Sequence, residues 1–72
     1  MKVLIFRTDI STINSVQKVA SMFDTHSKIH KWFVDLEDID NVLKIKANTH
    51  LTEDEVQHLV DSKGFYCEPL PD

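Results

Sequence analysis

The segment that decides the fold is residues 29–47, which read IHKWFVDLEDIDNVLKIKA. Apolar side chains alternate with other side chains along residues 29–36, and they do so again along residues 42–47. A period of two places successive side chains on opposite faces of a β-strand. The sequence therefore predicts two strands, Ile29–Leu36 and Val42–Ala47, joined as a hairpin by a polar turn over Glu37–Asn41.

A strand and a helix are predicted before this hairpin. The apolar run Val3–Phe6 indicates a buried strand within Met1–Thr8. Apolar residues then recur every three or four positions, as they do on one face of a helix. These residues are Ile13, Val16, Val19, Ala20 and Phe23. Ser11 or Thr12 can cap this helix through its hydroxyl group.

A second helix and a last strand are predicted after the hairpin. Thr52 and Glu55 have the spacing of a capping box, and Gly64 stands where a left-handed residue would end the helix. The apolar stripe between them consists of Val56, Leu59 and Val60. Phe65–Glu68 is the predicted last strand. Two prolines are expected to end its pairing, Pro69 and Pro71.

The resulting order, βαββαβ, predicts an α+β, ferredoxin-like fold with a four-stranded antiparallel sheet and both helices on one face. Each crossover should be right-handed. The expected core combines the helical stripes with one face of the strands. Its members are Leu4, Phe6, Val16, Val19, Ala20, Phe23, Trp32, Val34, Leu43, Ile45, Val56, Leu59 and Val60.

The opposite face of the sheet has no helix to cover it. If Leu4 and Phe6 face the helices, then Val3 and Ile5 must face away, and Phe33 should join them. Exposed apolar groups on one face predict a contact surface for a protein partner or a weak homodimer. An alternative is that the face is solvated by its basic residues, which are Lys31, Lys44 and Lys46.

Composition excludes several classes of protein. The chain has 72 residues, with twelve acidic and eight basic side chains and a formal net charge of −4. Surfaces for nucleic acids or anionic membranes need clustered positive charge, so we expect neither partner. A single cysteine cannot form an internal disulfide, and the run Val3–Phe6 is too short for a signal peptide or membrane span. We expect one domain over residues 1–72, reduced and cytoplasmic.

Two segments resemble the heavy-metal-associated domain, the small copper- and zinc-handling module of metallochaperones and P-type ATPases. Trp32-Phe33-Val34-Asp35-Leu36-Glu37 is similar to the alternating stretch, ending in Asp-Leu, that opens the hairpin of that family. Ser62-Lys63-Gly64-Phe65-Tyr66 is similar to its Gly-aromatic end of the second helix. The order and length of the elements agree with this family along nearly the whole chain.

The metal loop of that family reads Met-x-Cys-x-x-Cys between the first strand and the first helix. In this sequence Ile10 falls at the Met, Thr12 at the first Cys and Ser15 at the second. Phe65 falls at the aromatic or Lys position that faces the loop. A neutral hydroxyl is a hard, weak donor that cannot replace a thiolate toward a soft ion such as Cu(I). The resemblance therefore implies the family's fold with its Cys-x-x-Cys motif replaced by Thr12-Ile13-Asn14-Ser15, and with no bound metal or other cofactor.

Other chemistry-bearing residues favour structural interpretations. Cys67 is expected to be a buried strand residue, and the histidines to be surface residues. The four histidines are His26, His30, His50 and His58. The acidic residues at the hairpin lack the EF-hand pattern and indicate a solvated turn. They are Asp35, Glu37, Asp38 and Asp40.

No enzymatic function is expected. Asp9 lies near Thr12 and Ser15, but no histidine is placed to activate a hydroxyl. Acylphosphatases share the topology, but they need an arginine cradle in a glycine-containing first loop, and Arg7–Ser11 contains no glycine. RNA-recognition folds need aromatic and basic residues on the central strands, which this acidic chain does not match.

The function predicted is that of a non-catalytic protein-interaction or ligand-binding module. Two alternatives stay open. One is a metal carrier that uses histidines and Cys67 as ligands, a reading that metal titration of the reduced protein would test. The other is a small-molecule sensor of the ACT type, which shares the fold but has glycine-rich turns that this chain lacks.

Overall fold

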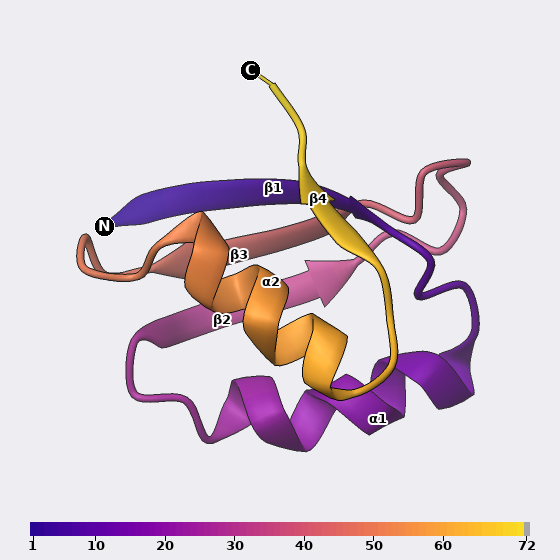
Figure 1. Cartoon of the computed structure of the whole chain (residues 1–72), viewed down its shortest axis with the longest axis horizontal. Helices are drawn as coiled ribbons and strands as arrows, with labels where there is room; N and C mark the ends of the chain where they lie inside the picture. Colours follow the sequence, from indigo (N-terminus) through magenta and orange to yellow (C-terminus); the bar gives the residue numbers. More distant parts are fainter. Residues whose placement is uncertain (72) are drawn as a thin grey trace.

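The predicted hairpin forms one side of a four-stranded antiparallel sheet with the strand order β2-β3-β1-β4 (Figure 1). The computed structural model describes residues 1–71. Its elements are β1 (Lys2–Thr8), α1 (Ile13–Asp24), β2 (Ile29–Val34), β3 (Leu43–Ala47), α2 (Glu53–Ser62) and β4 (Cys67–Pro69). The predicted βαββαβ order and ferredoxin-like fold are confirmed.

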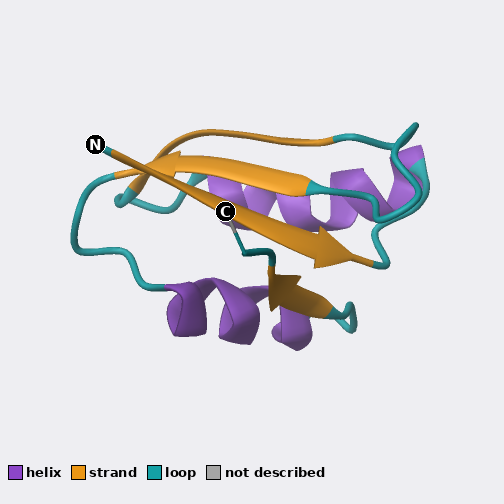
Figure 2. Ribbon diagram, turned by 90° about the horizontal axis from the view of Figure 1, so that it is seen from above, coloured by secondary structure: helices purple, strands orange, loops and turns teal. Residues whose placement is uncertain are grey.

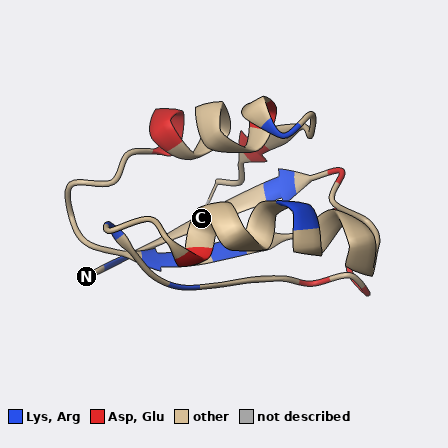
Figure 3. Ribbon diagram, turned by 90° about the horizontal axis from the view of Figure 1, so that it is seen from below, with Lys and Arg blue, Asp and Glu red and all other residues tan. Residues whose placement is uncertain are grey.

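Both helices lie on one side of the sheet. The strands pass in front of α1 in Figure 2, and α1 passes in front of the strands in the opposite view of Figure 3. Helix α1 packs against β2 and α2 packs against β4. Buried side chains of both helices belong to one core cluster, so the two helices cover the same face of the sheet. Neither helix of the described part has the length and apolar character that crossing a membrane would require.

The core lies between the helices and this face. Its buried apolar members are Leu4, Phe6, Ile10, Val19, Phe23, Leu43, Ile45, Ala47, Leu51, Val56, Val60 and Cys67. Five predicted members are only partly buried, namely Val16, Ala20, Trp32, Val34 and Leu59. Of these, Val16, Trp32 and Val34 pack against the core. Ile13, the first residue of α1, shares the predicted apolar spacing of this helix but is 63% exposed.

Each helix begins at a threonine. Thr12 caps α1 and Thr52 caps α2, each by accepting a hydrogen bond from the backbone N–H three residues later. The predicted choice between Ser11 and Thr12 is therefore settled for Thr12. Gly64, with φ = 86°, takes the left-handed conformation just after α2, as the sequence indicates.

Two predicted strands have different ends in the structure. Strand β2 ends at Val34 and not at Leu36, because the Asp35 carboxylate accepts the Glu37 N–H at 3.1 Å and turns the chain. Strand β4 is Cys67–Pro69 and not Phe65–Glu68, because the Phe65 N–H still bonds the Val60 carbonyl of α2.

Pro69 does not end the pairing of the last strand. It lies opposite Phe6, and the Leu70 N–H donates to the Ile5 carbonyl at 2.9 Å. The prediction was wrong because β4 is an edge strand, where a residue without an N–H can be tolerated on the side that faces away from the sheet.

Candidate functional site

The loop between β1 and α1 is fixed at its start by hydrogen bonds to two other parts of the chain. The buried Thr8 hydroxyl accepts from the Ile10 N–H at 3.1 Å and donates to the Asn41 carbonyl at 2.7 Å. The Asp9 carboxylate accepts the Tyr66 N–H at 2.7 Å. The loop is thus attached to the β2–β3 connection on one side and to the segment before β4 on the other.

The loop ends in a pair of hydroxyl groups. The Thr12 Oγ1 accepts the Ser15 N–H at 3.1 Å and donates to the Ser15 Oγ at 3.0 Å. Both side chains therefore meet at the N-terminus of α1, where the helix dipole is positive. Two hydroxyl groups do not fit a soft metal ion such as Cu(I), which prefers thiolates.

Ile10 and Phe65, the other two predicted residues of this loop site, have hydrocarbon side chains that cannot act as ligands. Ile10 is completely buried in the core, and Phe65 is a partly buried side chain packed against it. Among residues 1–71, no three His, Cys, Asp or Glu side chains gather closely enough to hold a metal ion. Of the four predicted residues, Thr12 and Ser15 are joined by a side-chain hydrogen bond.

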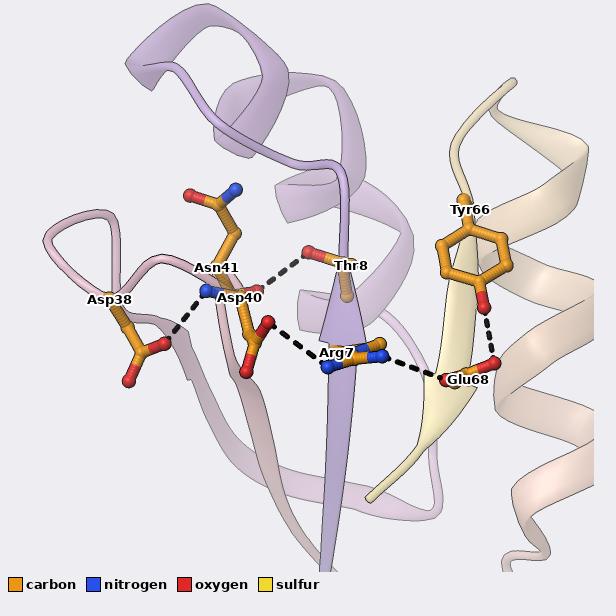
Figure 4. A network of polar contacts seen from close by, with 7 residues as sticks. All are labelled: Arg7, Thr8, Asp38, Asp40, Asn41, Tyr66 and Glu68. Carbon is orange, nitrogen blue, oxygen red and sulfur yellow. Dashed lines mark hydrogen bonds and ion pairs between the residues drawn. The ribbon is translucent and has the colours of Figure 1, made fainter.

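A charged network, which the sequence did not predict, lies at the end of β1 beside this loop (Figure 4). Arg7 forms ion pairs with Asp40 at 3.2 Å and with Glu68 at 3.4 Å. The Tyr66 hydroxyl donates to the Glu68 carboxylate, and this hydrogen bond is the main reason that the pKa of Tyr66 is raised above 10.0. The network connects the β2–β3 loop to β4 across β1.

The acidic residues of the hairpin loop shape the turn. The Asp35 and Asp38 carboxylates accept backbone N–H groups two residues later, at 3.1 and 2.8 Å. Such Asx turns allow the chain to reverse without regular pairing. Asn41 completes the turn with φ = 46°.

Cys67 is buried, as predicted, and it is one of the residues that line a groove between α2 and β4. This groove has a volume of about 330 Å³ and is also lined by His58, Asp54 and Asp61. Burial raises the pKa of the Cys67 thiol to about 12, so the sulfur is protonated at neutral pH. Since a thiol must lose its proton to bind metal, Cys67 is a poor ligand in the folded protein.

The histidines are dispersed. His30, His50 and His58 are exposed on β2, before α2 and on α2. The partly buried His26 accepts the Lys28 N–H at its Nδ1 atom, at a distance of 3.2 Å.

Raising the pH should destabilise the protein through Cys67. The folded protein holds the thiol proton to about pH 12, whereas an unperturbed thiol releases it near pH 9.0. The unfolded chain then binds fewer protons than the folded one, so the free energy of unfolding falls as pH rises above 9, with a slope that steepens toward a limit of about 1.4 kcal/mol per pH unit. Urea titrations from pH 8 to 10.5 should show this slope, and Cys67→Ala should reduce it. If the free energy of unfolding depends equally on pH in the wild type and in Cys67→Ala, the dependence does not come from Cys67.

The open face of the sheet carries apolar and basic side chains in alternation. The register places Lys46 opposite both Val3 and Lys31, and it places Lys44 opposite both Ile5 and Phe33. Val3 and Phe33 are about half exposed, at 49% and 50%. The three predicted contact residues, Val3, Ile5 and Phe33, thus share one face, but the lysines of β3 separate Phe33 from the other two.

Relieving the repulsion between Lys31 and Lys46 should stabilise the fold. Like charges directly opposite each other on neighbouring strands are unfavourable, whereas opposite charges attract. We expect Lys46→Glu to raise the free energy of unfolding by about 0.2–1 kcal/mol at low salt, and by less at 1 M salt, where the interaction is screened over roughly 3 Å. Denaturant titration measures the change. Lys18→Glu on the exposed side of α1 alters net charge equally, and an equal gain there would refute the cross-strand explanation.

Comparisons with known proteins agree on the fold. No protein-family model and no curated protein sequence matches this chain. The solution structure of the Atx1–Cu(I)–Ccc2a complex contains a chain that matches with a TM-score of 0.85 and 16% identity, covering 100% of this chain and 99% of that one. A copper-binding domain from HMA7, a P-type ATPase, matches with a TM-score of 0.83 and 15% identity, covering 99% and 96%.

A third solved structure gives the same result. The Cu(I)-loaded first domain of the human copper chaperone for SOD1 matches with a TM-score of 0.78 and 21% identity, covering 93% of this chain and 89% of that one. The chain therefore has the fold of heavy-metal-associated domains, which confirms the structural resemblance drawn from the sequence.

Proposed function

We propose that this chain is a non-catalytic interaction module with the heavy-metal-associated fold, in which hydroxyls stand where the family's metal loop has thiolates. The observation that carries the proposal is the contact between the Thr12 and Ser15 side chains, 3.0 Å apart at the N-terminus of α1. Each hydroxyl already participates in the cap of the helix, and neither can become an anionic sulfur ligand.

The surroundings of the loop support a non-catalytic role. Asp9 is the carboxylate nearest in sequence to the two hydroxyls, and it accepts the Tyr66 backbone N–H at 2.7 Å. Arg7 is occupied by Asp40 and Glu68. A nucleophilic hydroxyl needs a base within hydrogen-bond reach, and among residues 1–71 Thr12 and Ser15 hydrogen-bond only with each other and with the backbone.

Contact with another protein is the role that we assign to the module. One of the matched structures is a complex of two proteins, Atx1 and Ccc2a, joined with Cu(I). In this chain we assign the contact to the open sheet face, where Val3 and Phe33 are about half exposed. The assignment needs no metal, because it depends on side chains that the helices leave uncovered.

Competition for Cu(I) tests the proposal. The reduced protein is titrated into Cu(I) held by a coloured chelator such as bicinchoninate, at neutral pH under nitrogen. We expect the chelator spectrum to stay unchanged, because no thiolate pair is present. Withdrawal of one equivalent of Cu(I) would contradict the proposal and favour the metal-carrier alternative.

If the protein does withdraw Cu(I), the same titration of variants identifies the ligands. Since His58 and Cys67 line one groove, His58→Ala and Cys67→Ser would be the first variants to measure. Loss of Cu(I) binding in both variants would place the metal in this groove.

A further inference from the structure

Positive charge is concentrated on one face of an acidic molecule. The chain has a formal net charge of −4, yet the open face of the sheet carries Lys31, Lys44 and Lys46. Arg7, further along the same face of β1, is neutralised by Asp40 and Glu68. None of the three lysines forms an ion pair with any described residue.

The lysines and apolar groups are interleaved on this face. Lys46 stands between Val3 and Lys31, and the Lys44 Nζ lies 6.0 Å from the centre of the Phe33 ring. Between β2 and β3 the face is hollowed by about 250 Å³, and the residues that line the hollow are Lys31, Trp32, Phe33, Lys44 and Lys46. The Trp32 side chain packs against Phe23 on the helix side of the sheet, so the side chains on the open side are those of Phe33 and the three lysines.

This arrangement is unfavourable for the isolated domain. Lys31 and Lys46 lie directly opposite each other, which places two like charges at the spacing where cross-strand repulsion is felt. A segment that brings carboxylates to this face would remove the repulsion and cover Phe33 at the same time. The pattern of the surface thus indicates the chemistry of its partner.

We propose that the open face of β1, β3 and β2 docks an acidic protein segment in extended conformation, with carboxylates at the lysines and apolar side chains at Val3 and Phe33. The proposal deepens the proposed function, on which it rests, by naming the class of partner. An extended chain suits this face because every second side chain points to the same side, so these positions can carry both the carboxylates and the apolar groups that meet the sheet.

A nucleic acid fits the face less well. Binding to phosphates grows with the number of cations engaged, and three lysines are few for a polyanion. The exposed carboxylates of Asp35 and Glu37 follow β2 directly and would repel a strand of phosphates that extended beyond the sheet. A short acidic segment can end before it reaches them.

The test uses a fluorescein-labelled peptide of about ten residues that repeats Glu-Thr-Leu-Thr, so that glutamate and leucine point to the same side of the extended chain, and a matched peptide with lysine in place of glutamate. Anisotropy measures affinity, and amide shifts of the ¹⁵N-labelled protein locate the site. We expect shifts on β1, β2 and β3, and a loss of affinity of roughly tenfold or more in Lys31→Glu with Lys46→Glu. The lysine peptide should not bind.

A matched double variant separates local charge from net charge. Lys18→Glu with Lys63→Glu changes the total charge equally, but both residues are exposed on or beside the helices. This variant should retain the affinity of the wild type to within about twofold, because distant exposed charges are screened. Lys31→Gln with Lys46→Gln should give an intermediate loss, and it provides a milder change if the first variant folds poorly.

Several results would overturn the docking proposal. One is an equal loss of peptide affinity in both charge-reversal variants. Another is a set of amide shifts confined to the helices. A third is tighter binding of a single-stranded RNA oligonucleotide, or of phosphatidylserine vesicles, than of the acidic peptide. If the amide signals of the sheet residues broaden as the protein concentration rises, with no peptide present, the face is assigned to contact with a second copy of the chain. The Cu(I) competition is separate, since tight Cu(I) binding contradicts the proposed function whereas an unperturbed sheet face contradicts only the docking.

Discussion

Replacing Phe23 with alanine is expected to lower the free energy of unfolding by about 3–5 kcal/mol. Phe23 is completely buried, and its ring centre lies 5.1 Å from that of Trp32 at an interplanar angle of 57°. Removing the ring deletes this aromatic contact and leaves a cavity. Trp32 cannot readily move to fill it, because its Nε1 donates to the Asp24 carboxylate at 2.8 Å.

Denaturant titration, followed by tryptophan fluorescence, measures this loss. A domain of this size has a stability of roughly 5–15 kcal/mol, so the variant should unfold at a much lower denaturant concentration. Ile13→Ala is the matched control on the same helix, because Ile13 is 63% exposed and its loss should change stability by less than about 0.5 kcal/mol. A midpoint for Phe23→Ala no lower than that of the control would show that the Phe23 ring does not support the core.

The sequence predicted the fold because its periodic patterns match the elements that the structure contains. Alternation at residues 43–47 places Leu43, Ile45 and Ala47 on the buried face. Ile13 has the same helical spacing as the buried Val19 and Phe23, but as the first residue of α1 it is 63% exposed. Periodicity indicates which residues share a face, but it does not indicate how far the partner surface extends.

Leu51 and Ile10 are buried residues that lie outside the elements predicted from the sequence. Leu51 precedes the Thr52 cap and Val56 lies in the first full turn of α2, and both are completely buried. This is the spacing of a hydrophobic staple, and it could have identified Leu51 from the sequence. Ile10 is buried because the Thr8 hydroxyl fixes the loop, a contact that depends on the Asn41 carbonyl from a distant segment.

The candidate surfaces depend on register, which the sequence did not determine. The strand alternation correctly placed Val3, Ile5 and Phe33 on one face. It could not show that Lys44 stands between Ile5 and Phe33, because that depends on the pairing of β3 with both neighbours and on the irregularity of β2 between Ile29 and Lys31. Long-range pairs such as Arg7 with Glu68 are beyond sequence reasoning for the same reason.

Restoring two thiols to the first loop is expected to create a Cu(I) site. The Thr12 and Ser15 hydroxyls are already 3.0 Å apart, so Thr12→Cys with Ser15→Cys should place two sulfurs that can bind one ion together. The N-terminus of α1 lowers the pKa of cysteines placed there, which favours the thiolate form. We expect the double variant to withdraw one equivalent of Cu(I) from a chelator that the wild type leaves untouched, and X-ray absorption should show two sulfur neighbours.

Three further variants decide whether the arrangement of the two thiols matters. Each single cysteine variant should bind Cu(I) at least roughly a hundredfold more weakly than the double variant. In the double variant the second sulfur is already held beside the first, so its binding costs less entropy than the binding of a separate ligand. Thr12→Cys with Asn14→Cys has the same number of thiols in the same loop but at the wrong spacing, and it should resemble the single variants. If the correctly spaced pair binds no Cu(I), then the alignment of this loop with the family's metal loop is wrong, because the fold would be present and the donors would be adequate. If the misplaced pair binds equally well, thiol content alone is sufficient, and the contact between Thr12 and Ser15 does not mark the position of the family's metal site.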